Sequence, residues 1–219
     1  MIKINYEKRW DNVKSSLGER EAFVAALPGN TRYLANSESP PGTPPSSTMN
    51  YVVIPKKSEP FAITSSLEEH RCRHESSVKD IRCWTTYPDI KSDGKSALEI
   101  LKSSLKEIKA KQIFTDTKVS LGRSFKVSVS SNVNELRSIK SKAELQRIKK
   151  AIKQSDAGQM FAHNLVESGE GLSEKEVRSE IDYFMARKGI QENSFSTIVA
   201  SGPNSAHSHH SNTCLLYTS

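Results

Sequence analysis

Short apolar runs alternate with helix-like segments between residues 6 and 115, and this alternation restricts the fold more than any other feature of the sequence. The runs are rich in β-branched or aromatic residues and are bounded by Pro, Gly, Ser or charged residues, which is typical of strands. Strands and helices in alternation predict an α/β layer domain that ends near residue 132. The expected strands are Glu21 to Leu27, Tyr51 to Pro55, Phe61 to Thr64, Ile81 to Thr86 and Gln112 to Thr115, and the expected helices are Tyr6 to Leu17 and Ser96 to Ala110.

The run from Pro40 to Ser47, with four prolines and one glycine, cannot lie inside a helix or a sheet. Proline lacks a backbone N–H and its ring restricts φ, so it interrupts both kinds of hydrogen-bond ladder. We therefore expect a surface loop at this point. A proline-rich motif that binds a partner is the alternative interpretation.

Two capping boxes predict two helices in the second part of the chain. Ser141 with Glu144, and Ser173 with Glu176, have the spacing in which the serine oxygen and the glutamate carboxylate each accept from the other's backbone N–H. The first helix carries an apolar stripe at Leu145, Ile148 and Ile152, and the second has Val177, Ile181, Phe184 and Met185 on its expected core face. A strand from Phe195 to Ala200 and a turn from Ser201 to Asn204 are expected to follow.

Length and charge patterning exclude several classes of protein. A chain of 219 residues is long enough for one domain, or for one and a fraction. Its longest apolar runs, such as Phe23 to Leu27, fall far below the roughly 18 residues that a membrane-spanning helix needs. The N-terminus carries charges where a signal peptide would have its apolar stretch. We therefore expect a cytoplasmic protein with no membrane association.

The cysteines indicate neither a disulfide framework nor a structural zinc site. Cys72, Cys83 and Cys214 are odd in number and none forms a C-x-x-C pair. The segment Cys214 to Ser219 also back-translates to TGT CTC TTA TAC ACA TCT, the mosaic end of a transposase-based sequencing adapter. We therefore interpret residues 214–219 as adapter translation, so that the authentic sequence ends at Thr213. A natural apolar terminus is the alternative.

Most of the positive charge lies in one segment. Between Arg137 and Lys153 there are seven basic residues and one acid, Glu144, so this segment carries six of the chain's seven net positive charges. A basic helix face can contact phosphates without sequence specificity. It can equally be a solvated face, since no aromatic stacking platform accompanies it.

Three histidines follow the expected turn, at His207, His209 and His210. Neutral imidazole is a common metal ligand and also handles protons near neutral pH. However, neighbouring side chains on an extended chain point to opposite faces, and no Cys, Asp or Glu lies between residues 198 and 213. A metal ligand, a histidine that contacts substrate or moves a proton, and an incidental exposed histidine therefore all stay open on spacing alone.

Several of these segments resemble one protein family. Residues 136–151, Leu136 to Ala151, are similar to the segment that joins the two domains of the creatinase/aminopeptidase P/prolidase metallopeptidases, family M24, with the pita-bread fold. Gly171 to Glu174, then Phe195 to Ala206 followed by His209 and His210, resemble the start of that family's catalytic domain. Residues 30–34, Asn-Thr-Arg-Tyr-Leu, resemble its non-catalytic domain. Two features depart from the family pattern: a short stretch from Thr115 to Asn132, and His207 and Ser208 where an apolar residue and a proline are more usual.

The resemblance implies an α/β fold in three parts. These are a creatinase-like N-terminal mixed-sheet domain at residues 1–132, a truncated start of the pita-bread peptidase domain at 133–213, and the tail at 214–219. It also implies hydrolysis of the bond before proline at a peptide N-terminus by an Xaa-Pro aminopeptidase or dipeptidase. Two divalent ions, Mn, Co or Zn, would activate water and polarise the scissile carbonyl in the full-length parent.

Family ligands would all lie beyond Thr213, so we expect no metal in this chain and no activity from it. The resemblance assigns one functional residue, His209, as the catalytic and substrate-binding histidine that hydrogen-bonds near the scissile bond. The implied partners are proline-containing peptides and a second copy of the full-length protein; nucleic acid is not expected. The alternative is a non-catalytic pita-bread protein that binds peptides or nucleic acid, and a free-standing basic nucleic-acid module is a further one. A full set of downstream metal ligands would separate the enzyme from the binders.

Overall fold

The computed structural model describes residues 3–36, 49–168 and 171–213. These residues divide into two compact units, 3–140 and 141–213, and each is treated by itself. The expected loop from Pro40 to Ser47 and the tail from Cys214 to Ser219 lie outside the described residues. In the described ranges, no helix is both long enough and apolar enough to cross a membrane.

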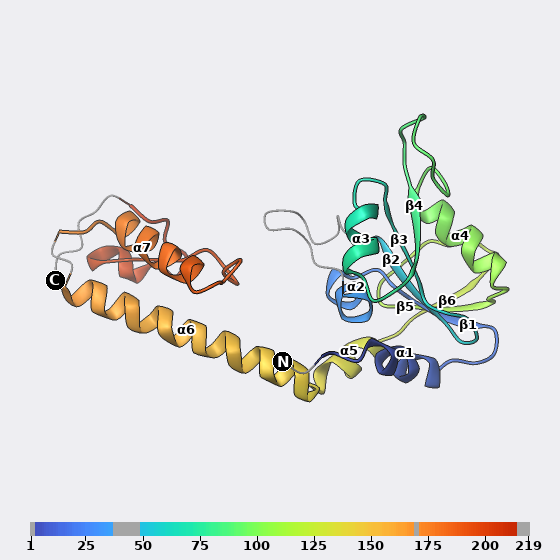
Figure 1. Ribbon diagram of the computed structural model, residues 1–219, viewed down its shortest axis with the longest axis horizontal. Coiled ribbons are helices and arrows are strands. Elements are labelled where there is room, and N and C mark those ends of the chain that lie inside the picture. Colours follow the sequence, from blue (N-terminus) through green and yellow to red (C-terminus); the bar gives the residue numbers. More distant parts are fainter. Residues whose placement is uncertain (1–2, 37–48, 169–170, 214–219) are drawn as a thin grey trace. The chain divides into compact units, whose positions relative to one another are not determined.

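Unit 3–140 is built on a six-stranded mixed sheet with the order β4-β3-β2-β1-β5-β6 (Figure 1). β1 lies antiparallel to β2 and parallel to β5, which places Phe23 opposite both Ile54 and Phe114. The sheet confirms the predicted mixed α/β class and all five expected strands. The strands are β1 (Glu21–Ala25), β2 (Tyr51–Pro55), β3 (Phe61–Ser65), β4 (Asp80–Trp84), β5 (Gln112–Thr115) and β6 (Lys126–Val129).

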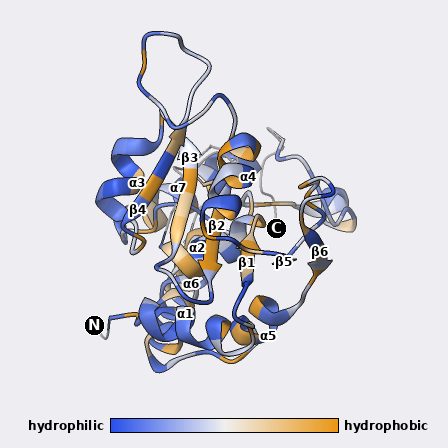
Figure 2. Cartoon of the chain, turned by 90° about the vertical axis from the view of Figure 1, so that its right-hand side faces the viewer, coloured by the Kyte–Doolittle hydropathy of each residue, from blue (hydrophilic) through white to orange (hydrophobic). Residues whose placement is uncertain are grey.

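Both faces of the sheet are covered, because side chains of a strand alternate between its two faces. In β1, Phe23 and Ala25 join one buried cluster while Ala22 and Val24 join the other. The first cluster includes side chains of α1 (Tyr6–Ser15), α2 (Pro28–Ala35), α3 (Glu69–Glu75) and α5 (Asn132–Ser138). The second is closed by α4 (Ala97–Glu107). Figure 2 shows the apolar strands β2 and β3 in orange.

Helix α2 was not expected from the sequence, because Gly29, Asn30 and Thr31 are poor helix formers. A carboxylate that directly follows β5 compensates for them. Asp116 accepts from the backbone N–H groups of Ala26 and Leu27 at 2.9 and 3.1 Å, and from Asn30 Nδ2 at 2.9 Å. Asn30 Oδ1 in turn accepts from Arg137 Nη1 of α5 at 2.8 Å. The start of α2 is therefore held by tertiary hydrogen bonds that no local pattern reveals.

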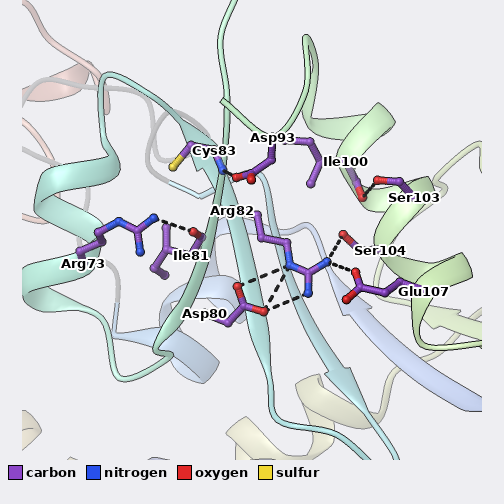
Figure 3. Close-up of polar contacts among 10 residues, drawn as sticks. All are labelled: Arg73, Asp80, Ile81, Arg82, Cys83, Asp93, Ile100, Ser103, Ser104 and Glu107. Carbon is purple, nitrogen blue, oxygen red and sulfur yellow. Dashed lines mark hydrogen bonds and ion pairs between the residues drawn. The ribbon is translucent and has the colours of Figure 1, made fainter. Parts of the chain in front are cut away.

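Arg82 connects strand β4 to helix α4 on the second face (Figure 3). Its Nη1 donates to Ser104 Oγ at 2.7 Å and to Glu107 Oε2 at 2.8 Å, and its Nη2 donates to Asp80 Oδ2 at 3.0 Å. The guanidinium also lies 4.3 Å from the centre of the Phe61 ring. Arg82, on the edge strand β4, thus donates hydrogen bonds to three side chains and covers the ring of Phe61.

Unit 141–213 consists of helices α6 (Lys142–Ser168) and α7 (Glu174–Arg187), the 3₁₀ helix η2 (Gly202–Ala206) and connecting segments (Figure 1). The rings of Phe161 and Phe184 stack with centroids 4.2 Å apart where α6 meets α7. Gly158 of α6 lies against Met185 of α7, and a Cβ on Gly158 would lie 2.5 Å from Met185 Sδ. Gly158, although a poor helix former, is therefore a point where α7 approaches α6 closely.

Two expectations for this unit differ from the structure. The apolar stripe of α6 does not reach a core, because Leu145, Ile148 and Ile152 are 45, 42 and 53% exposed and α7 packs farther along the helix, at Gly158 and Phe161. The predicted strand from Phe195 to Ala200 is wrong, since these residues pair with no other strand among the described residues. A strand needs a neighbour for its backbone groups, and side-chain hydrogen bonds hold this segment instead.

The packing of α4 predicts a large effect for one core substitution. Leu101 is fully buried, so Leu101→Ala should lower the free energy of unfolding of unit 3–140 by about 2–5 kcal/mol. Leu67→Ala is the matched control, because Leu67 is 76% exposed and its loss should cost less than about 0.5 kcal/mol. Urea unfolding followed by tryptophan fluorescence measures both, as Trp10 and Trp84 both belong to this unit. Equal effects of the two substitutions would contradict the packing.

Candidate functional site

The candidate site is built around Glu174, the first residue of α7. The capping box predicted at Ser173 is confirmed: Ser173 Oγ accepts from the Glu176 N–H at 3.3 Å, and Glu176 Oε2 accepts from the Ser173 N–H at 2.8 Å. Gly171, with φ of +81°, precedes the cap in a conformation that favours glycine. The cap fixes the direction in which the chain enters α7, and the side chain of Glu174 is fully buried.

Both carboxylate oxygens of Glu174 accept hydrogen bonds from the segment 201–213. Oε1 accepts from Ser201 N at 2.8 Å, Ser201 Oγ at 3.3 Å and Asn204 Nδ2 at 3.1 Å. Oε2 accepts from Thr213 N and Oγ1 at 2.8 Å each, and lies 2.8 Å from His210 Nε2. We call these five residues the Glu174 cluster. It holds the two ends of the segment 201–213 on one carboxylate.

The charge state of Glu174 follows from these contacts. Burial by itself would raise the pKa of Glu174, since an ion loses its hydration. Hydrogen bonds from the Thr213 backbone, Asn204, His210 and the Ser201 backbone outweigh burial and hold the pKa of Glu174 well below its usual range. The buried side chain is therefore a carboxylate that only accepts hydrogen bonds.

A second acid holds the segment that precedes Ser201. Asp182 Oδ1, on α7, accepts from Thr197 Oγ1 at 2.6 Å and from Asn193 Nδ2 at 2.9 Å. Asn212 Nδ2 donates to the Val199 carbonyl at 3.0 Å. The residues expected to form a strand are thus held beside α7 by polar side chains.

The three histidines take different positions. His210 is nearly buried, with 9% of its side chain exposed, and its ring faces Glu174. His209, the predicted catalytic and substrate-binding residue, is exposed, and so is His207. Among the described residues no hydrogen bond to either of their rings is found. The fold therefore separates the two adjacent histidines, one toward the buried carboxylate and one toward the surface.

The sequence placed Glu174 in a motif that resembles the family, but it did not predict that Glu174 is the centre of the cluster. The available signal was an acid at the first position of a capped helix, followed by a segment rich in Ser, Asn, Thr and His but without Asp or Glu. What the sequence does not show is that the carboxylate points away from solvent.

The described residues do not fit a metal centre. Within residues 3–36, 49–168 and 171–213, no three His, Cys, Asp or Glu side chains lie together in a way that could hold an ion. Glu174, the acid beside His210, already accepts on both oxygens, so it has no position left for a metal.

Comparison with known proteins identifies the segment that contains this cluster. Residues 146–216 match metallopeptidase family M24. Over this segment the chain is similar to family M24. The match continues three residues beyond Thr213, into the tail interpreted above as adapter sequence. Two similar proteins are the Xaa-Pro dipeptidase of Pyrococcus furiosus, 39% identical over 77 residues, and the putative dipeptidase YkvY of Bacillus subtilis, 36% identical over 117 residues.

Solved structures share the fold of this chain. The Xaa-Pro dipeptidase from Bacillus anthracis superposes on 97% of this chain with a TM-score of 0.72 and 23% identity. The prolidase from Pyrococcus horikoshii covers 95% with a TM-score of 0.72 and 21% identity. This chain covers 57% of each of those two structures, and the matches to the P. furiosus and B. subtilis proteins span 22 and 29% of their lengths.

Cys72 and Cys83 lie in unit 3–140, and their environment is that of core residues. Burial, with a further contribution from Glu69, raises the pKa of the Cys83 thiol to about 12, and burial also raises the pKa of Cys72. Both thiols should therefore react with iodoacetamide at pH 8 at least about a hundredfold more slowly in the folded chain than in urea. Mass spectrometry of the two cysteine peptides measures this. Similar rates in both conditions would show that these thiols are accessible.

The lowered pKa of Glu174 predicts a pH dependence of unit 141–213. A carboxyl group with a depressed pKa in the folded state stabilises that state above its unfolded pKa, and the stabilisation is lost as the pH falls below about 4.5. Amide hydrogen exchange in α7, corrected for intrinsic rates, should therefore accelerate between about pH 5 and 3. Glu176, whose pKa is lowered by hydrogen bonds from Ser173, contributes in the same range.

Substitution of Glu174 distinguishes its contribution to the acid dependence from that of Glu176. Glu174→Gln should reduce the protection of α7 amides at pH 7 by more than about tenfold and should weaken the acid dependence, while Glu176 retains its share. Glu180→Gln, at an exposed position of the same helix, is the control and should change neither. An unchanged acid dependence in Glu174→Gln would contradict the role of this carboxylate.

Proposed function

We propose that this chain is the first part of a metal-dependent Xaa-Pro peptidase, an aminopeptidase or dipeptidase that hydrolyses the bond before proline at the N-terminus of a peptide. The observation that carries the proposal is the M24 match over residues 146–216, the segment that includes both Glu174 and His209. Similarity to proteins named Xaa-Pro dipeptidase and putative dipeptidase supports the same reaction.

The proposal includes a division of the chain. Residues 1–132 would form the creatinase-like N-terminal domain, and residues 133–213 the start of the pita-bread peptidase domain. In the full-length parent, two divalent ions would supply a nucleophilic hydroxide and polarise the scissile carbonyl. Because the described residues do not fit such a pair, we expect no hydrolysis by this chain alone. We further propose that the parent is a cytoplasmic homodimer that acts on proline-containing peptides.

His209 is the residue of this chain that we assign to the reaction. Its side chain is exposed, so its imidazole has both nitrogens available to a bound peptide. A neutral imidazole can donate a hydrogen bond to a peptide group beside the scissile bond, or a proton to the departing nitrogen. His210 is turned toward Glu174 and is excluded from that task.

The test compares this chain with the product of its native gene continued beyond Thr213. Both are incubated with an Xaa-Pro dipeptide and an Xaa-Pro-Xaa tripeptide in the presence of Mn²⁺, Co²⁺ or Zn²⁺. The longer protein should release the N-terminal residue and the 219-residue chain should not. In the longer protein His209→Ala should lower kcat by about a hundredfold or more, while His207→Ala, the neighbouring control, should leave it within about twofold.

Each component of the proposal can fail separately. Metal-dependent cleavage by the 219-residue chain would overturn the expectation that it is inactive. A longer protein that lacks the carboxylate ligands, or that has them and cleaves neither peptide, would overturn the peptidase assignment. Equal effects of His207→Ala and His209→Ala would remove the role assigned to His209.

Exposed basic residues favour one alternative, a non-catalytic pita-bread protein that binds nucleic acid. Lys142, Arg147, Lys149, Lys150 and Lys153 are all exposed on α6. Phosphate binding by these residues would give an affinity that falls steeply with salt. Fluorescence anisotropy with a labelled duplex at 50 and 200 mM salt tests it. Tight binding that decreases at least about a hundredfold, together with missing downstream ligands, would favour this alternative.

A further inference from the structure

The segment that carries His209 is attached to α7 mainly through one side chain. Six of its donor atoms, from Ser201, Asn204, His210 and Thr213, lie 2.8 to 3.3 Å from the carboxylate of Glu174. A further hydrogen bond between this segment and α7 runs from Lys175 N to the Thr213 carbonyl, at 3.3 Å. The position of His209 relative to α7 therefore depends on Glu174.

We propose that Glu174 is a positioning residue for His209, which acts by orienting the His210 ring and by fixing both ends of the segment 201–213. The role of His209 toward a peptide rests on the proposed function, whereas the effect of Glu174 on the segment does not. No bond is made or broken in this role, and the carboxylate does not meet substrate, because its side chain is fully buried.

Hydrogen-bond chemistry determines the tautomer of His210. A carboxylate that accepts from five other donor atoms has no hydrogen to give, so the 2.8 Å contact requires that His210 Nε2 carries the hydrogen. A neutral His210 then has its lone pair on Nδ1. The ring is thus held in one orientation, and the backbone that leads from it to His209 is held with it.

The geometry of the segment explains why both of its ends matter. Ser201 and Asn204 bind one oxygen at the start of η2, and Thr213 binds the other after the histidines. Inside the segment, Asn204 N donates to the Ser201 carbonyl and His207 N to the Asn204 carbonyl, which shape the turn without attaching it to α7. Loss of one oxygen as an acceptor would remove the hydrogen bonds to Glu174 at one end of the segment.

The experiment uses the 219-residue chain labelled with ¹⁵N and ¹³C, with Glu174→Gln as the variant and Glu180→Gln as the matched control. Glutamine keeps the size of the side chain but replaces one acceptor oxygen with a donor, so one group of three donors must lose its partner. In the unsubstituted chain the long-range ¹H–¹⁵N spectrum should show the hydrogen of His210 on Nε2, and relaxation should show a restricted His209 backbone amide. In Glu174→Gln, amide exchange at Ser201 or Thr213 should accelerate at least about tenfold and the His209 backbone should become mobile.

Spectra are recorded well below the unfolding transition, so that a loss of stability alone would not move the ring signals. Unchanged His210 nitrogen shifts and unchanged His209 relaxation in Glu174→Gln would overturn the proposal. If Glu174→Gln does not fold, His210→Phe decides, because it keeps a ring and removes one donor. Increased mobility of His209 in that variant supports the proposal, and unchanged mobility overturns it. These readouts need no catalysis, so absent peptidase activity in the longer protein would count only against the proposed function.

Discussion

A carboxylate is stable in a protein interior only if donors replace the water it loses, and Glu174 meets this condition with six contacts from residues far along the chain. The donors come from a segment without strand pairing and with little apolar surface. Folding of that segment and burial of the acid are therefore mutually dependent: neither is favourable without the other. The pKa of Glu174 is lowered for the same reason, since both oxygens can accept all six contacts only when the carboxyl group is ionised.

In unit 3–140, Asp116 is a similar carboxylate that accepts fewer hydrogen bonds. Asp116 follows a buried strand and accepts from two backbone N–H groups and from Asn30, which lets a sequence of poor helix formers begin α2. Here, however, the hydrophobic burial on both faces of the sheet provides most of the stability, and the acid decides local geometry. In unit 141–213 hydrophobic burial contributes less, because several large apolar side chains of α6 are exposed. Polar contacts to Glu174 define the arrangement of its C-terminal segment.

Local signals predicted most of the secondary structure. The strands from Glu21 to Thr115 have apolar, β-branched runs, and the capping boxes at Ser141 and Ser173 have the required spacing, so each could be recognised within a few residues. β6 could not, because an edge strand with alternating Lys, Val, Ser and Val has only a weak pattern. The segment from Phe195 to Ala200 has a strong strand pattern and still forms no strand, since pattern alone does not supply a pairing partner.

The candidate site, too, was predicted from the sequence only in part. The sequence by itself determined that a capped helix, a turn and a group of histidines follow one another, because these depend on spacing along the chain, and the resemblance it carries to M24 peptidases was confirmed for residues 146–216. Only the tertiary structure decided that Glu174 is buried, that His210 faces it and that His209 is exposed. The physical reason is that two adjacent histidines are equivalent in sequence, and they become different only when a carboxylate 36 residues away takes one of them as a hydrogen-bond partner.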